Sequence, residues 1–351
     1  MTIDQLLATA KEQKASDLHI SVGIRPKCRV NGVLHEMEEY DVVTPDLAKA
    51  IIEPMFRPHQ QAAINEKGEI DFAYSTKELG RFRVNAFKQK GCYSAVLRIV
   101  ETVIPSAGQL GLPWSMTDLT KKKRGLVLVT GPTGSGKSTT LASLIDIINS
   151  EQSVHVITLE DPIEYVHQHK KAIVNQREIG MDTISYDNAL RAALREDPDV
   201  ILVGEMRDLD TISTAITAAE TGHLVFSTLH TIGAAPTIDR IIDVFPPHQQ
   251  DQIRIQLASV LEAVISQQLL PTADGKGRVA AFEVMHATPA IRNQIREGKT
   301  HQIESIIQTS KKIGMQTMDD ALFDLYMKRK IDGAKAIEFA QDPVTMEGKL
   351  Y

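Results

Sequence analysis

The chain has 351 residues, enough for about two domains with at least one sizeable hydrophobic core. Its composition is 42% hydrophobic and 24% charged, with 21 glycines and 15 prolines, which is typical of a globular protein and excludes collagen-like and disordered chains. The longest unbroken apolar runs have four residues, whereas a transmembrane helix needs about twenty, so no membrane span is expected. A formal charge of −6 disfavours nucleic acid as the main partner.

The N-terminus and the cysteines indicate the compartment. The sequence MTIDQLLATAKEQK lacks the basic start, apolar run and small-residue cleavage site of a secretory signal, so we expect a cytoplasmic protein. The chain has two cysteines, Cys28 and Cys92, and lone thiols in a cytosolic protein are usually reduced packing residues. Two cysteines cannot form a four-cysteine zinc site.

Residues 1–100 alternate short strand-like runs with polar turns. Hydrophobic residues recur with a period of two, and Asn31-Gly32 is a hairpin signal. Helical patterns are expected over 2–13 and 45–56. We therefore predict a small α+β domain, whose expected strands are 17–23, 27–34, 69–75, 80–89 and 92–100.

A linker is predicted over 101–120, because prolines, glycines and a serine interrupt the pattern over 104–114. Apolar strands then alternate with helices over 121–285, which is typical of a mainly parallel sheet covered on both faces. The predicted fold class is thus α/β for this larger part. Its expected strands are 126–130, 154–160, 199–205 and 223–230, and its expected helices are one ending at Ile148 and those over 186–195 and 210–219.

After Pro246 the pattern indicates helices alone, and 286–351 is predicted to be a C-terminal helical region. Further helices are expected over 290–308 and 318–328. One apolar stripe at helical spacing contains Ile253, Leu257, Val260, Leu261, Val264, Ile265 and Leu269.

The strongest motif is GPTGSGKST, which matches the phosphate-binding loop G-x-x-x-x-G-K-[ST] and lies between an apolar strand and a helix. Glycines allow backbone N–H groups to surround phosphate oxygens, and the helix N-terminus adds its dipole. The lysine reaches the terminal phosphates and Ser138 can bind Mg²⁺. The expected nucleotide-binding residues are Gly131, Pro132, Thr133, Gly134, Ser135, Gly136, Lys137, Ser138 and Thr139.

Two acidic segments follow apolar strands in the same part of the chain. In DVILVGEMRD, Glu205 comes at a strand's carboxyl end, where it can hold Mg²⁺ through water or polarise the attacking water. In TLEDPIEY, Pro162 stops the strand and places Glu160, Asp161 and Glu164 in a loop suited to a general base. Solvated acids at strand ends are the alternative interpretation for both segments.

Histidines and arginines complete the candidate residues. His223 and His230 bracket one strand at an odd separation, so alternation places them on opposite faces, which argues against one metal site. A capping or core role is the alternative to a phosphate contact by His230. Arg81 and Arg83 share a strand face and are candidates for a phosphate clamp across an interface. Two other arginines, Arg195 and Arg207, have the alternative of pairing with the acidic loops.

Taken together, the segments SDLHIS, GPTGSGKST, TLEDPIEY, ALREDPDVILVGEMRD and TAAETGHLVFSTLHT resemble, in order and spacing, the secretion ATPase superfamily of type II secretion and type IV pilus motors. The resemblance covers nearly the whole chain. Within it, AIRNQIREGK at 290–299 resembles the signature of the PilT-type retraction ATPases, with Gln294 in place of a leucine. Asp210 stands where the family usually has glutamate, from which we expect little consequence.

The resemblance implies a PAS-like N-terminal domain joined to a RecA-like ATPase core, assembled as a homo-hexamer on the cytoplasmic face of the inner membrane. ATP and Mg²⁺ are the implied ligands. Glu160 is the implied catalytic base, with Glu164 as the alternative, and Glu205 is the implied Walker B acid. Arg81 and Arg83 match the family's arginine fingers, and His223 and His230 match the ends of its His box.

The implied function is a motor that powers pilus retraction, with an inner-membrane platform protein and a paralogous retraction ATPase as partners. Extension and secretion members commonly carry a four-cysteine zinc module, whereas residues 271–278 form a short segment without cysteine. The missing module favours retraction over extension. A pilus-extension or secretion motor is the first alternative. A RecA-like nucleic-acid translocase and a nucleotide-gated scaffold without turnover are less favoured. In the 290–298 helix, Ile291 and Ile295 are expected to be buried, while Arg292 and Arg296 are expected to project outward.

Overall fold

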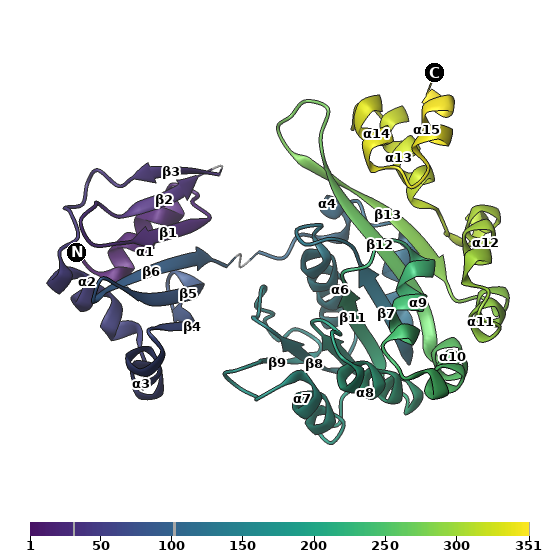
Figure 1. The fold of residues 1–351 in the computed structure, drawn as a ribbon, viewed down its shortest axis with the longest axis horizontal. Helices are drawn as coiled ribbons and strands as arrows, with labels where there is room; N and C mark the ends of the chain where they lie inside the picture. Colours follow the sequence, from purple (N-terminus) through teal and green to yellow (C-terminus); the bar gives the residue numbers. More distant parts are fainter. Residues whose placement is uncertain (31, 101–102, 351) are drawn as a thin grey trace. The chain divides into compact units, whose positions relative to one another are not determined.

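The computed structural model describes residues 1–30, 32–100 and 103–350, and it divides into two compact units, Met1–Val103 and Ile104–Tyr351 (Figure 1). Asn31 of the expected hairpin and residues 101–102 of the expected linker lie outside the described residues. Each unit has its own hydrophobic core.

The N-terminal unit is an antiparallel sheet of six strands, in the order β3-β2-β1-β6-β5-β4, with three helices. Val30 pairs with Val33, so the strands on both sides of residues 31 and 32 form the expected hairpin. The strands are β1 (Asp17–Ile20), β2 (Lys27–Val30), β3 (Val33–Glu36), β4 (Glu69–Thr76), β5 (Gly80–Gln89) and β6 (Cys92–Ile99), and the helices are α1 (Ile3–Glu12), α2 (Pro45–Ile52) and α3 (Pro58–Lys67).

Helix α3 has no counterpart among the predicted elements. Only Gln60 and Ile64 of its residues are buried, so it carries no apolar stripe for periodicity to detect. Its limits have clear local causes: Pro58 stands at the first helical position, and Gly68 ends the helix in the left-handed conformation (φ 84°).

The second unit is built on a seven-stranded sheet, in the order β13-β12-β7-β11-β10-β8-β9. Strands β12 to β9 in this order run parallel to one another, and β13 pairs antiparallel with β12 at one edge. The mainly parallel α/β fold is thereby confirmed. The strands are β7 (Gly125–Thr130), β8 (His155–Glu160), β9 (Ile173–Glu178), β10 (Val200–Val203), β11 (Leu224–Leu229), β12 (Leu261–Pro271) and β13 (Arg278–His286).

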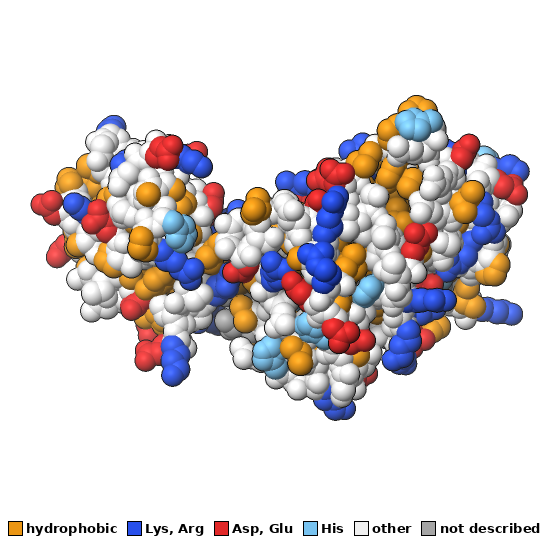
Figure 2. All heavy atoms as spheres, turned by 90° about the horizontal axis from the view of Figure 1, so that it is seen from below, with side chains coloured by type: hydrophobic (Ala, Val, Ile, Leu, Met, Phe, Trp, Pro, Cys, Tyr) orange, Lys and Arg blue, Asp and Glu red, His pale blue; other side chains and the backbone are white. Residues whose placement is uncertain are grey.

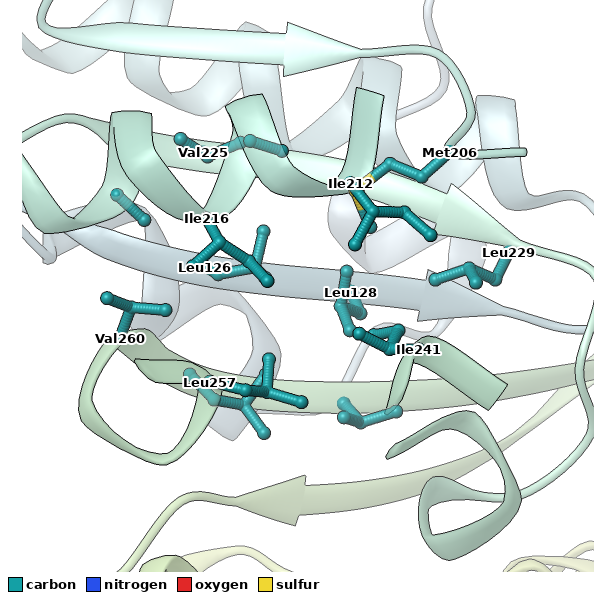
Figure 3. Close-up of a cluster of buried hydrophobic side chains, with 14 of the residues drawn as sticks. Leu126, Leu128, Met206, Ile212, Ile216, Val225, Leu229, Ile241, Leu257 and Val260 are labelled. Atoms are coloured by element: carbon teal, nitrogen blue, oxygen red, sulfur yellow. The ribbon is translucent and has the colours of Figure 1, made fainter. Parts of the chain in front are cut away.

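Helices cover both faces of this sheet, as the strand composition predicts. Alternate residues of β7 enter different hydrophobic clusters: Leu126 and Leu128 lie in one, and Val127 and Val129 lie in the other. Figure 3 shows the first cluster, where Ile212 and Ile216 lie over Leu126 and Leu128. The helices up to β12 are α4 (Ala107–Leu110), α5 (Trp114–Thr117), α6 (Lys137–Glu151), α7 (Tyr186–Ala193), α8 (Leu209–Glu220), α9 (Ala234–Asp243) and α10 (Pro247–Val260).

The prediction of helices alone after Pro246 is wrong. Helix α10 ends at Val260, and the rest of the expected stripe forms strand β12, which pairs with β7 on one side and β13 on the other. Because β12 is buried on both faces, its apolar residues do not alternate with polar ones, and such a run satisfies helical spacing as well as strand spacing. Strand β9 was also not predicted.

The remaining chain is helical. The expected helix over 290–308 is two helices, because Gly298 adopts the left-handed conformation (φ 67°) after α11. In the described part of the chain, no helix combines the length and apolar character needed to span a membrane. The last helices are α11 (Pro289–Arg296), α12 (Ile303–Thr309), α13 (Met318–Met327), α14 (Gly333–Phe339) and α15 (Pro343–Leu350).

Candidate nucleotide-binding site

The parallel strands bring the sequence-predicted residues to one edge of the sheet. Strands β8 and β10 are in register at Leu159 and Val203, so Glu160 and Glu205 both follow at their carboxyl ends. Strands β7 and β11 are in register at Thr130 and Leu229, which places the glycine loop and His230 at the same edge. Ligands of open α/β sheets bind at this edge.

The glycine loop connects β7 to α6 through a tightly enclosed path. Gly131 has φ 143°, and a Cβ there would lie 2.2 Å from the Gln267 carbonyl oxygen and 2.8 Å from Ser135 Oγ. Gly136 has φ 90°, and its Cβ would lie 2.9 Å from Gln267 Nε2. Both positions therefore require glycine. Ser135 Oγ is buried without a hydrogen-bond partner among the described residues, which leaves a donor for a ligand oxygen.

Gln267 of β12 is a site residue that sequence reasoning missed. Its Nε2 donates to the Ser135 carbonyl at 2.7 Å, and its Oε1 accepts from Thr140 Oγ1 at 2.8 Å. One buried side chain thus fixes the loop and the first turn of α6. No local motif signals this role, because the partners lie more than a hundred residues away in the sequence.

Lys137 is the first residue of α6 and is almost fully buried. Its ammonium donates to the carbonyls of Gly131 (2.8 Å) and Pro132 (3.0 Å), which holds it at the loop. Burial lowers the pKa of Lys137, while the charges of Glu205 and Glu164 oppose that shift. Two acidic side chains therefore lie close enough to act on the lysine electrostatically.

Glu205 pairs with two cationic or polar side chains. Its Oε2 lies 3.2 Å from His230 Nε2, and its Oε1 lies 2.5 Å from an Arg207 guanidinium nitrogen. The pairing of Arg207 with an acidic segment is thus confirmed, and the carboxylate raises the pKa of the Arg207 guanidinium. The residue before Glu205 is Gly204, and a Cβ at this position would lie 2.8 Å from Tyr186 OH.

Glu160 and Glu164 have different surroundings. The Oε1 of Glu160 accepts from Thr158 Oγ1 at 2.6 Å and from Gln176 Nε2 at 3.1 Å, whereas Glu164 is exposed. Burial raises the pKa of Glu160, and these hydrogen bonds act in the opposite direction. Glu160 is thus the oriented carboxylate of the two.

Tyr186, at the start of α7, is a second residue that sequence reasoning missed. Burial raises the pKa of its hydroxyl, and the charges of Glu205, Asp161 and Glu160 act in the same direction. The phenol therefore stays neutral beside a group of acids and can donate a hydrogen bond to an anion.

The two histidines lie at opposite ends of β11. His223 Nδ1 lies 2.9 Å from the Ala218 carbonyl at the end of α8, which matches the capping interpretation. His230 is exposed and faces Glu205. The structure therefore brings His230 to the candidate site and leaves His223 at the other edge of the sheet.

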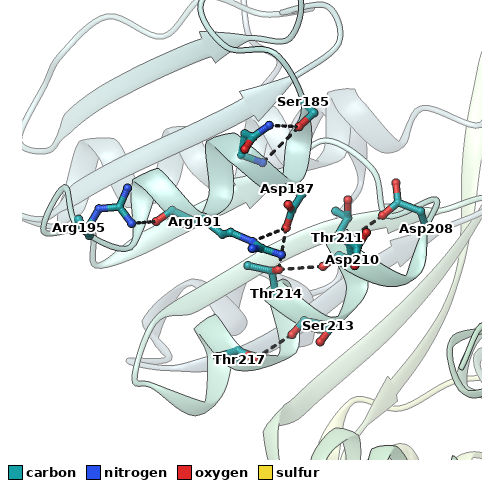
Figure 4. A network of polar contacts seen from close by, with 11 residues as sticks. Ser185, Asp187, Arg191, Arg195, Asp208, Asp210, Thr211, Ser213, Thr214 and Thr217 are labelled. Carbon is teal, nitrogen blue, oxygen red and sulfur yellow. Dashed lines mark hydrogen bonds and ion pairs between the residues drawn. The ribbon is translucent and has the colours of Figure 1, made fainter. Parts of the chain in front are cut away.

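Side chains of helices α7 and α8 form a polar network (Figure 4). Asp187 accepts from Arg191 at 2.8 Å and from Thr214 Oγ1 at 3.2 Å, which joins the two helices. Arg195 donates to the Arg191 carbonyl at 3.1 Å. Asp210 contributes its carbonyl to Thr214.

Arg81 and Arg83 lie in β5 of the N-terminal unit, where Arg83 is exposed and Arg81 is partly buried. They are two residues apart on one strand and share a face. The phosphate loop belongs to the other unit.

Helix α11 differs in one respect from expectation. Ile291 and Ile295 are fully buried, as predicted, and Arg296 is exposed. The outward projection of Arg292 is wrong, because its guanidinium donates to the carbonyls of Ala258 and Ser259 at the end of α10 and to Glu262. Arg292 therefore caps a helix C-terminus.

These observations define the class of protein. The site is the nucleotide site of a P-loop ATPase. A buried strand leads into a loop in which two glycines are sterically required, and a buried lysine follows at a helix N-terminus. Two carboxylates lie at the ends of adjacent strands. No cluster of three or more metal-ligating side chains exists among the described residues.

Comparison with known proteins identifies the family. The sequence profile of the Type II/IV secretion system protein family matches residues 1–325, and the chain belongs to this family. It is 48% identical to the type IV pilus retraction ATPase PilT of Pseudomonas aeruginosa, over 98% of this chain and 99% of that protein. It is 47% identical to a twitching motility protein of Neisseria gonorrhoeae, over 98% and 92%. The crystal structure of the pilus retraction motor PilT with bound ADP matches with a TM-score of 0.94 and 48% identity, covering 99% of each chain. The resemblance to PilT-type members is confirmed.

Proposed function

We propose that this protein is the ATP-hydrolysing motor of type IV pilus retraction. The observation that carries the proposal is the 48% identity to PilT over nearly the full length of both chains, combined with an intact phosphate loop and acid pair. A strain without the protein should carry excess pili that do not retract, and the wild-type gene but not a Lys137→Ala gene should restore twitching. Normal retraction without the protein would contradict the proposal.

ATP is the proposed substrate. Residues 131–139 surround its phosphates through the loop amides, the Ser135 hydroxyl and the Lys137 ammonium. Ser138 and Glu205 are the residues proposed to hold Mg²⁺, the latter through water, and the ion would offset developing charge on the phosphate oxygens.

Glu160 is the proposed general base. Its two side-chain donors hold the carboxylate in one orientation, and burial raises its pKa, which makes it a stronger proton acceptor. Glu205 is the proposed Walker B acid, with His230 beside it as a sensor of its position. Glu164 remains the alternative base.

Arg81 and Arg83 are the proposed arginine fingers, acting on nucleotide from the N-terminal unit within a homo-hexamer. In the full-length protein, Arg83→Ala should lower kcat while nucleotide binding persists, because charge on the transferring phosphate loses a partner. Lys88→Ala is the matched control, since Lys88 is exposed on the same strand. Equal kcat in both variants would remove the arginine from the site.

The proposed location is the cytoplasmic face of the inner membrane, with the protein bound peripherally to a pilus platform protein. A paralogous retraction ATPase is a further proposed partner. Closure of the units on ATP and reopening after hydrolysis would supply the stroke.

Two alternatives make different predictions. An extension or secretion motor would carry a zinc module between β12 and β13, where this chain has the short segment 272–277, and its only cysteines are Cys28 and Cys92. A nucleic-acid translocase would need a basic groove, whereas Figure 2 shows Lys and Arg interspersed with Asp and Glu on the face drawn. ATPase activity stimulated by DNA would revive the second alternative.

A further inference from the structure

Glu283 of β13 is a buried carboxylate outside the phosphate loop and the acid pair. Its exposed fraction is 3%, and an ionised carboxylate at such a position is costly unless several donors surround it. Burial raises the pKa of Glu283, and hydrogen bonds from three segments of the chain oppose the rise.

The first contact is the start of α9. This helix directly follows residues 230–233, called the His230 segment below. Helix α9 has Gly233 at its N-cap and therefore no capping side chain of its own. Glu283 Oε1 accepts from the Ala234 amide at 2.6 Å, and Ser266 Oγ accepts from the Gly233 amide at 2.9 Å. Ser266 and Glu283 are cross-strand partners, so the β12–β13 hairpin caps α9 with two adjacent side chains.

The second contact is the C-terminal helical region. Glu283 Oε2 accepts from Gln341 Nε2 at 3.1 Å and from the Met318 amide at 3.4 Å, the first residue of α13. Gly233 also lies against this region, because a Cβ there would be 3.4 Å from Gln341 Nε2. One carboxylate thus joins the starts of α9 and α13.

The segment between His230 and α9 is short and internally bonded. Thr237 Oγ1 donates to the Gly233 carbonyl at 2.6 Å and contacts Thr231 Oγ1 at 2.7 Å. Hydrogen bonds thus link the start of α9 to residue 231, next to the histidine that faces Glu205.

We propose that Glu283 is a positioning residue that ties the His230 segment, and through it Glu205, to the C-terminal helices. This proposal rests on the proposed function of the site and extends it. Movement of α13 or of the loop at Gln341 would alter how His230 meets Glu205, without any contact between those helices and nucleotide.

The test is a set of substitutions in the full-length protein. In Glu283→Gln, an NH2 group replaces one carboxylate oxygen and faces the backbone N–H of either Ala234 or Met318, so one contact becomes a repulsion between donors. We expect kcat to fall about tenfold while KM for ATP stays within about twofold, because the phosphate loop is untouched. Hydrogen exchange of a peptide covering 233–237 should also accelerate.

Two further variants separate positioning from stability. Asp319 accepts from the Gln341 and Asp342 amides, so Asp319→Ala loosens the C-terminal loop that Glu283 holds without contacting Ala234; kcat should fall about threefold, and KM for ATP should stay within about twofold. Gln341→Glu added to Glu283→Gln restores a donor–acceptor pair and should recover kcat to within about threefold of wild type.

The proposal is overturned if kcat of folded Glu283→Gln stays within about twofold of wild type, or if Asp319→Ala leaves kcat at the wild-type value. If Glu283→Gln does not fold, Ser266→Ala decides: a kcat lowered about threefold at unchanged KM supports the proposal, and wild-type kcat overturns it. Failure of the proposed function is distinct, because wild-type protein would then hydrolyse no ATP.

Discussion

The phosphate loop and the β12–β13 hairpin contribute to the nucleotide site by different means. The loop presents backbone amides and Lys137 outward, toward phosphate oxygens. The hairpin turns its polar side chains inward, so that Gln267 binds the loop and Ser266 and Glu283 bind the start of α9. Changes in the loop should therefore abolish the chemistry and spare the fold, whereas changes in the hairpin should shift kinetics and stability together.

The largest effect is expected for Lys137→Ala. Loss of the ammonium removes the charge that offsets the terminal phosphates, so ATP hydrolysis should fall by about a hundredfold to a thousandfold or more, and ATP affinity should fall too. The melting temperature should change little, because a desolvated cation is removed. Steady-state ATPase assays measure hydrolysis, and thermal unfolding measures the melting temperature. Wild-type turnover in Lys137→Ala would contradict the role of Lys137 in phosphate binding.

Substitution of the acids should separate binding from turnover. Glu160→Gln and Glu205→Gln should bind ATP but lose about 10²- to 10⁴-fold in kcat, because an amide neither accepts the proton nor acts as an anionic ligand. Glu164→Gln is the control and should retain turnover. Nucleotide binding measured beside hydrolysis tests this, and a loss confined to Glu164→Gln would move the base to that residue.

Gln267→Leu should show the mixed behaviour of the hairpin. Two buried hydrogen bonds are lost, so we expect KM for ATP to rise about tenfold and stability to fall by about 1–3 kcal/mol. Gln268→Leu is the matched control, since Gln268 donates to the Phe339 carbonyl and not to the loop. If KM for ATP is unchanged in Gln267→Leu, or rises equally in Gln267→Leu and Gln268→Leu, then Gln267 does not support the phosphate loop.

The two arginines of α11 should differ in their effect on stability. Arg292→Ala leaves the α10 carbonyls and Glu262 without their donor, so the free energy of unfolding should fall by about 2 kcal/mol. Arg296→Ala at an exposed position should change it by less than about 0.5 kcal/mol. Denaturant unfolding compares the two variants. Equal free energies of unfolding would show that the inward contacts of Arg292 do not stabilise the protein.

The smallest expected effect is a gain. Gln294 Oε1 is buried without a hydrogen-bond partner among the described residues, so Gln294→Leu should raise the free energy of unfolding by about 1 kcal/mol. Asn293→Leu on the exposed face of the same helix should give no gain. A melting temperature lowered by Gln294→Leu would show that the amide is satisfied.

Predictions from the sequence failed where hydrophobic residues show no clear period. This happens in an element that is buried on both faces and in a helix that buries very few residues. In strand β12, burial on both faces leaves no alternation of apolar and polar residues, so its apolar residues continue the helical spacing of α10. Helix α3 was missed for the opposite reason, since it buries only Gln60 and Ile64. One glycine, Gly298, was enough to divide the expected helix over 290–308.

The sequence by itself determined the phosphate loop, the strand-end acids and the parallel sheet, because each depends on residues adjacent in the chain and on backbone geometry that those residues impose. Only the tertiary structure decided that Glu160 is oriented and Glu164 exposed, that Arg292 turns inward, and that Gln267 and Glu283 support the site. The reason is physical: burial and hydrogen bonds between distant segments arise only when those segments pack, and no local pattern records which partner a polar side chain will meet.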